Sequence, residues 1–224
     1  MIEETAALIL PAGYNLTDAA YKAMEVVCGK DISIIFGVEE KEVTPDKPAV
    51  TFKDIKEGSF YYDSVYWAVR KDITQGIGDS LFNPEGTCTR AQVVTFLWRA
   101  AGEPKPETTK NPFVDVEEGA YYFVSVLWAY EIGITLGLVG EHFDPEGACT
   151  RAQVVTFLWR VAEKPKAETA KNPFEDVKKG DYYYDAVLWA YKNGITNGIS
   201  DTQFQIDGTC KRAQAVTFLY RMYE

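Results

Sequence analysis

The sequence predicts a mainly α-helical protein made of three tandem helix–loop–helix repeats, preceded by a small α/β segment. The stretch from Thr89 to Arg99 recurs at residues 150–160 and 211–221, with the same spacing of 61 residues each time. The first two copies begin with a helix-capping pattern, and all three continue as a nearly all-apolar run. A period kept without insertions is typical of one supersecondary unit whose copies bury their apolar faces against one another.

The recurring stretch predicts the second helix of each repeat. Thr89 and Gln92 have the spacing of a capping box, in which each side chain accepts a hydrogen bond from the backbone N–H of the other. The following residues are apolar nearly all round, which favours a helix enclosed by neighbours over a surface helix: Val93, Val94, Phe96, Leu97 and Trp98. Gly102 and Pro104 then end the helix.

Arg90 lies in the first turn of this helix and recurs as Arg151 and Arg212. The helix dipole disfavours a cation there by about 0.3–1 kcal/mol. Accepting this cost three times suggests that the guanidinium and the free N–H groups share an anionic partner. The alternative is a structural salt bridge to an aspartate of a neighbouring motif: Asp54, Asp115 or Asp176. Three further arginines lie in the last turn of the same helices, where the helix dipole favours a positive charge: Arg99, Arg160 and Arg221.

A first helix is predicted over residues 62–70, 123–131 and 184–192, and each copy ends in Ile-Thr-x-Gly. A loop led by phenylalanine and ending in glycine then connects it to the second helix. Three copies packed around an axis would bring the second helices together as a central three-helix bundle, with the first helices outside. The tryptophans of the first helices are expected in the core, and Trp98, Trp159 and Tyr220 in the bundle.

Residues 1–50 do not belong to the repeat. Two β-branched or aliphatic runs, near residues 6–10 and 32–38, predict short strands with a helix between them. We expect a remnant of an upstream domain followed by a linker. The rest of the chain, residues 51–224, divides at connectors rich in Pro, Lys, Glu and Thr into three repeats: 52–112, 113–173 and 174–224.

Composition excludes several classes of partner. The chain has 33 acidic and 23 basic residues and a formal net charge of −10, and no basic block is present to neutralise nucleic acid. A few local arginines can still hold a small anionic ligand. The chain has no run of 18 apolar residues, so no membrane span is predicted. The acidic start predicts no secretory signal, so we expect either a cytosolic protein or a fragment of a longer one.

The sequence gives no support for an enzyme, a metal or a cofactor. The single histidine, His142, has no repeated counterpart, and no Ser or Cys nucleophile has a visible base. No CxxC pair exists to hold a metal. Three cysteines recur at the repeat period, and we expect small, buried, unpaired thiols: Cys88, Cys149 and Cys210.

Five signals recur in the same order in each copy. They are Phe-x-Asp-Val (Ile55 in the first copy), a Trp-Ala helix, Ile-Thr-x-Gly, a Phe-led loop ending in Gly, and Arg-Ala-Gln. Together they closely resemble the S-layer homology (SLH) domain, over about residues 52–224. The resemblance implies a pseudo-three-fold spindle with one repeat per lobe and grooves between the lobes. It also implies non-covalent attachment to a secondary polysaccharide of the Gram-positive cell wall, often through a pyruvylated amino-sugar.

The binding motif of that family, Thr-Arg-Ala-Glu, matches residues 89–92, 150–153 and 211–214. By that match the ligand-binding residues would be Thr89, Arg90, Gln92, Thr150, Arg151, Gln153, Lys211, Arg212 and Gln214. Glutamine replaces the glutamate in all three copies, and Lys211 replaces the capping threonine, so we expect comparable sites in repeats one and two and a different third. Tyrosines in strict register before the first helices could line the grooves or form a sealing aromatic collar: Tyr61, Tyr122 and Tyr183.

We therefore expect an extracellular cell-surface anchor, not an enzyme, whose partner is an anionic, pyruvylated cell-wall polysaccharide. The alternative is a structural or protein-interaction module that has lost glycan binding. The sequence makes no prediction of the oligomeric state.

Overall fold

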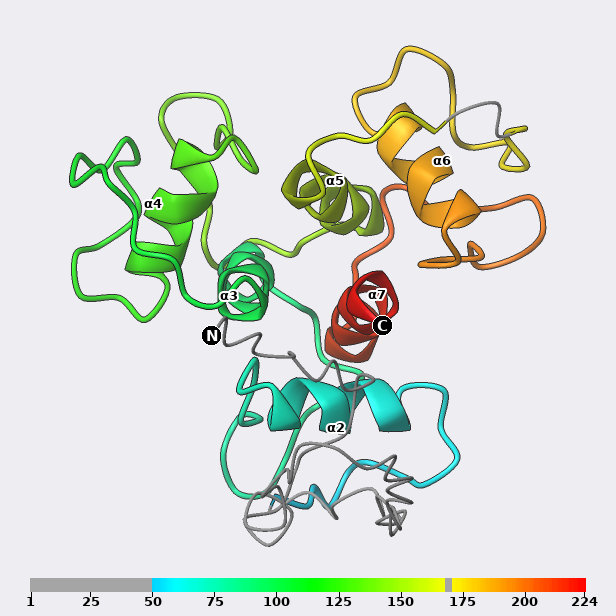
Figure 1. Ribbon diagram of the computed structural model, residues 1–224, viewed down its shortest axis with the longest axis horizontal. Helices are drawn as coiled ribbons and strands as arrows, with labels where there is room; N and C mark the ends of the chain where they lie inside the picture. The colour runs from blue at the N-terminus through cyan, green and yellow to red at the C-terminus, as the bar shows by residue number, and fades with distance from the viewer. Residues whose placement is uncertain (1–49, 168–170) are drawn as a thin grey trace, which may run out of the picture. The chain divides into compact units, whose positions relative to one another are not determined.

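The computed structural model describes residues 50–167 and 171–224 (Figure 1). The chain separates into two units, Met1–Pro45 and Asp46–Glu224, and every described residue belongs to the second. The predicted α/β segment lies outside the described residues except for its last residue. That segment and the predicted domain limits therefore stay predictions.

Six α-helices form in the described part of the chain, which has isolated β-bridges and no strand. The first helices of the repeats have the predicted bounds: α2 (Tyr62–Arg70), α4 (Phe123–Glu131) and α6 (Tyr184–Lys192). The second helices are α3 (Arg90–Ala100), α5 (Arg151–Val161) and α7 (Arg212–Tyr223). The prediction of a mainly α-helical protein with three tandem repeats is confirmed.

The second helices contact one another in all three pairings, and Figure 1 shows α3, α5 and α7 side by side with α2, α4 and α6 around them. Their apolar sequence follows from this position, because neighbours cover them on several sides. Val94 and Leu97 of α3 are fully buried, as are the equivalent residues of α5 and α7. The predicted central bundle therefore forms, while the three-fold symmetry itself stays a prediction.

The tryptophans differ from one another in burial. Trp67, Trp128 and Trp189 of the first helices are buried, as predicted. Trp98, Trp159 and Tyr220 are only half-buried and pack against the core from its edge, so their predicted place inside the bundle core is wrong. The two tryptophans share a further contact. Each donates its indole N–H to a proline carbonyl of the connector that follows, at 2.9 Å, because a polar N–H needs a partner that the apolar bundle does not offer.

Each first helix packs against the second helix of the preceding repeat. The pairs are α4 with α3 and α6 with α5, and α2 of the first repeat packs on α7 of the last. A buried hydroxyl pair supports two of these contacts: Thr95 with Ser125 at 3.0 Å, and Ser64 with Thr217 at 2.9 Å. The sequence did not predict these partners, because a helix pattern identifies the buried face of a helix and not the helix that covers it.

A ring of backbone hydrogen bonds joins the three repeats just before the second helices. The N–H of Cys88 donates to Cys210, that of Cys149 to Cys88, and that of Cys210 to Cys149, at 2.9–3.0 Å. The three thiols are free and fully buried, as predicted. Burial raises the pKa of Cys88 to about 12, so this thiol remains protonated and unreactive at neutral pH. Cys28 lies outside the described residues.

An aspartate of the Phe-x-Asp motif holds the Phe-led loop of its own repeat. Asp115 accepts the backbone N–H groups of Phe143 at 2.8 Å and Asp144 at 2.7 Å. Asp54 and Asp176 accept the equivalent pairs in their repeats. Partial burial raises the pKa of the Asp115 carboxyl, but the N–H donors and His142 outweigh it, so the net pKa is lowered.

Replacing Asp115 with asparagine should reduce the free energy of unfolding at pH 7 by about 1–3 kcal/mol, because one loop N–H then faces an amide NH₂. The native pKa lies below the unfolded one, so this stabilisation is present above the unfolded pKa and is lost as the pH falls through the native pKa. In urea unfolding, the difference in the free energy of unfolding between the parent and the variant should be large at pH 7 and should shrink below pH ~4. Asp201→Asn, at an exposed site, is the control and should change little; a constant difference at all pH values would contradict this account.

Gly198 closes the Ile-Thr-x-Gly turn at φ +79°, where a Cβ would lie 2.5 Å from a ring carbon of Phe174 and 2.6 Å from the carbonyl oxygen of Gln203. Gly194 has φ +69° but nothing within 4 Å of such a Cβ. Gly194→Ala should therefore cost about 1–2 kcal/mol from its backbone alone. Gly198→Ala should cost about 3 kcal/mol because overpacking adds to the same backbone penalty. Equal losses in urea unfolding would show that close packing is not the reason for glycine at residue 198.

Candidate functional site

The three motif arginines are buried between the repeats. Arg90, Arg151 and Arg212 have exposed fractions of only 3–4%. The Arg90 guanidinium carbon lies 4.8 Å from the ring centre of Phe143 and 5.7 Å from that of Phe157. Its Nε donates to the carbonyl oxygen of Phe143 at 2.7 Å. The other two arginines repeat this arrangement, with Phe204 and Phe218 around Arg151 and Phe82 and Phe96 around Arg212.

The Phe-led loop of another repeat receives the start of each second helix. At α3, the N–H of Arg90 donates to Gly147 at 2.9 Å and that of Ala91 donates to Pro145 at 3.0 Å. With Phe143, three carbonyl oxygens of one loop therefore surround the positive end of the helix and its arginine. Their dipoles offset the unfavourable position of the cation. The first-turn arginine thus has a structural explanation that does not require a ligand.

The predicted salt bridges to the motif aspartates are not formed. Within the described residues none of the three arginines makes an ion pair, since the aspartates accept loop N–H groups instead. Burial lowers the pKa of each guanidinium.

The capping boxes predicted at Thr89 and Thr150 are confirmed, with hydrogen bonds of 3.1–3.3 Å to Gln92 and Gln153. In the third copy Gln214 still accepts from the N–H of Lys211 at 3.1 Å. The Lys211 side chain makes no cap and pairs with Glu85 of the first repeat. The third repeat therefore lacks the side-chain cap, as predicted, and Lys211 forms an ion pair instead.

A groove of about 440 Å³ lies beside α3 and is lined by residues of all three repeats. It contains two cations, Arg99 of the first repeat and Arg212 of the third, and none of its lining residues is acidic. Arg99 donates from Nη1 to the carbonyl oxygen of Ile73 at 3.0 Å, which fixes its position at the groove. The remaining lining residues are Thr74, Gln75, Gly76, Ile77, Gln92, Thr95, Phe96 and Tyr121. We call this the α3 groove.

Tyr121 is the aromatic residue that projects from the second repeat into the α3 groove lining, and it is 60% exposed. Burial of its hydroxyl and the carboxylate of Glu146 raise its pKa, while a hydrogen bond to Thr89 opposes them. The predicted tyrosines lie one position later, at the half-buried N-caps of the first helices: Tyr61, Tyr122 and Tyr183. Their ligand-binding role stays a prediction.

Sequence reasoning missed Gln75 and Arg99 as groove residues, and it placed Tyr122 in the register set in preference to the neighbouring Tyr121. Adjacent tyrosines in two copies gave a signal for an aromatic wall, but they did not indicate which of the pair faces the groove. Arg99 was interpreted from the helix dipole alone. Of the predicted motif residues, Gln92 and Arg212 line this groove, and they come from different repeats because each second helix begins against a neighbouring repeat.

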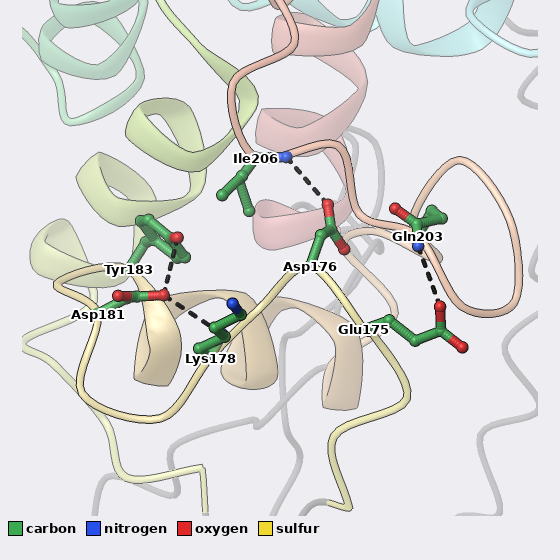
Figure 2. Close-up of a pocket in the computed structure, with 7 residues that line it drawn as sticks. All are labelled: Glu175, Asp176, Lys178, Asp181, Tyr183, Gln203 and Ile206. Carbon is green, nitrogen blue, oxygen red and sulfur yellow. Dashed lines mark hydrogen bonds between the residues drawn. The ribbon is translucent and has the colours of Figure 1, made fainter.

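A second pocket, of about 520 Å³, lies in the third repeat and has the opposite charge (Figure 2). Three carboxylates and one lysine line it: Glu175, Asp176, Asp181 and Lys178. Asp181 accepts the hydroxyl of Tyr183 at 2.9 Å, and desolvation together with this carboxylate raises the pKa of Tyr183 to about 12. The carboxylates disfavour an anionic ligand. Nowhere in the described residues do His, Cys, Asp and Glu side chains group so as to hold a metal ion.

None of the helices described here has both the length and the apolar character needed to cross a bilayer. Comparison with protein families gives three tandem matches to the S-layer homology domain, at residues 51–94, 112–155 and 173–216. These matches contain the first helix, the Phe-led loop and the start of the second helix of each repeat. The α3 groove and the motif arginines therefore lie on the matched segments, except for Thr95, Phe96 and Arg99 just beyond the first.

Similar proteins include exoglucanase XynX of Acetivibrio thermocellus, 29% identical over 80% of this chain and 17% of the relative. A cell surface protein of Thermoanaerobacter kivui is 33% identical over 50% of this chain and 15% of the relative. The cellulosome-anchoring protein of Acetivibrio thermocellus is 23% identical over 67% and 35%. The chain thus spans about a third or less of the length of these relatives. With three tandem copies of the domain over more than half of its length, the chain belongs to the S-layer homology family.

Proposed function

We propose that this chain anchors its protein to the cell surface by binding an anionic, pyruvylated cell-wall polysaccharide in the α3 groove. A cell-surface anchoring role is supported by the family and by relatives named as cell-surface and cellulosome-anchoring proteins. The proposed chemistry is binding, with no catalytic step. Two relatives with enzyme names match over only 17% and 10% of their length, and this proposal takes no activity from them.

The observation that carries the glycan assignment is the charge of the α3 groove. In a chain of net charge −10, its lining holds two guanidinium groups and no carboxylate, although Glu103, outside the lining, pairs with Arg99 at 4.0 Å. A pyruvyl carboxylate suits planar guanidinium donors, and the ring of Tyr121 offers an exposed face on which a sugar can stack. Gln75 and Gln92 add amide groups for hydroxyl and acetamido partners.

Sedimentation with purified Gram-positive sacculi tests this function. The chain should co-sediment with sacculi that keep a pyruvylated wall polysaccharide and stay in the supernatant once the polysaccharide is removed chemically. Binding should weaken at higher salt, because the groove charges are partly screened. Equal binding to stripped sacculi would reject the glycan proposal and favour the alternative, a protein-interaction or structural module.

A further inference from the structure

The three repeats place different side chains at the positions that line the α3 groove. Gln75 occupies one rim position, and the residues in register with it are Leu136 and Asn197. Tyr121 occupies another, and its counterparts are Tyr182 and Phe60. At these two positions, only the pair beside α3 joins an amide with a phenol, whereas the amide of Gln92 recurs in all three sets as Gln153 and Gln214. Taking the proposed function as given, we infer that the α3 groove is the one glycan-binding groove of this chain and that Gln75 helps to select it.

The position of Gln75 matters because it is exposed at the rim of the groove and polar. Its counterpart Leu136 is 73% exposed and is followed by exposed Leu138. A leucine offers no donor or acceptor to a sugar, and a sugar hydroxyl placed against it loses water without a replacement. Tyr182 remains near Arg90 and Arg160, whose charges lower its pKa against the effect of burial. The second set therefore keeps its phenol and arginines but lacks an amide at the Gln75 position.

The third set lacks the phenol. Phe60 is 66% exposed and can stack on a sugar but cannot donate a hydrogen bond. At α3 the side chain of Thr89 lowers the pKa of Tyr121 against the effect of burial, whereas the third copy has Lys211 in place of that threonine. The Lys211 ammonium is paired with Glu85, so its charge is already compensated. Asn197 keeps an amide at the Gln75 position of this set.

The three motif arginines also differ from one another, and the difference favours the α3 groove. Arg212 lines the α3 groove. In Arg90 and Arg151 the Nη2 atom is fully buried and has no hydrogen-bond partner among the described residues. This Nη2 atom cannot contact a carboxylate without rearrangement of the rings around it.

Two matched substitutions test the assignment, because Gln75 and Asn197 are both exposed amides at register-equivalent positions. Gln75→Leu should weaken binding of a synthetic pyruvylated amino-sugar glycoside by about tenfold, a loss of one good hydrogen bond. Asn197→Leu should change it by less than twofold. Isothermal titration of the parent chain should give one site per chain, and circular dichroism melting should be the same for all three proteins.

The outcomes separate this inference from the proposed function. Binding at two or three sites, or equal losses in the two leucine variants, would overturn the single-groove assignment while leaving glycan binding intact. A parent chain that binds neither the glycoside nor intact sacculi would overturn the proposed function, and the groove assignment with it.

Discussion

Replacing Phe143 with alanine should lower the free energy of unfolding by about 4 kcal/mol, the middle of the range for a buried aromatic ring. The ring is fully buried, and its centre lies 5.6 Å from that of Phe113 and 4.8 Å from the Arg90 guanidinium carbon. The variant therefore leaves a cavity where two repeats meet, and it removes one of the two rings that cover a buried cation. Urea unfolding followed by circular dichroism measures the loss.

Phe60→Ala is the matched control, because Phe60 is 66% exposed and its removal should cost less than about 1 kcal/mol. The Phe143 variant should unfold in one transition, since α2 of the first repeat packs on α7 of the last and the three repeats form one closed set of contacts. A separate transition of the second repeat alone would contradict this cooperative unit.

The elements of the fold could be predicted from the sequence, whereas their partners could not. Capping residues, apolar runs and turn glycines act locally, so the bounds of α2, α4 and α6 follow from neighbouring residues. The pairing of α2 with α7 depends on residues far apart in the chain. The hydroxyl of Ser64, which meets Thr217, looks in the sequence like any helix-surface serine.

The kinds of side chain in the candidate site could be predicted from the sequence, but the particular residues that form it could be predicted only in part. Arg212 and Gln92 follow from the repeated motif, but sites were counted one per repeat. The α3 groove instead combines Gln75 of the first repeat, Tyr121 of the second and Arg212 of the third. Burial of the arginine between two aromatic rings was not predictable either, because both rings come from the next repeat: around Arg90, Phe143 belongs to a loop 53 residues later and Phe157 to helix α5. A motif identifies which side chains recur, whereas the packing decides which copy reaches a surface.

Replacing Arg212 with lysine should weaken binding of the pyruvylated glycoside by about 30-fold or more, because the ammonium is a point charge and cannot form the paired N–H contacts of a guanidinium with a carboxylate. The same change at Arg90 or Arg151 is the control. All three arginines lie between two phenylalanine rings and donate Nε to a phenylalanine carbonyl, so the three variants should lose similar stability.

The affinity for the glycoside should distinguish the three lysine variants, although their stability should not. Arg90→Lys and Arg151→Lys should bind within about threefold of the parent, a change below about 0.7 kcal/mol, when titrated below their melting temperatures. Equal losses of affinity in all three variants would mean that the arginines support binding only through the fold, or that every groove binds. A loss confined to Arg212 requires direct contact with the ligand, because its two counterparts have the same rings, the same carbonyl bond and the same charge, and differ in whether the guanidinium lines the α3 groove.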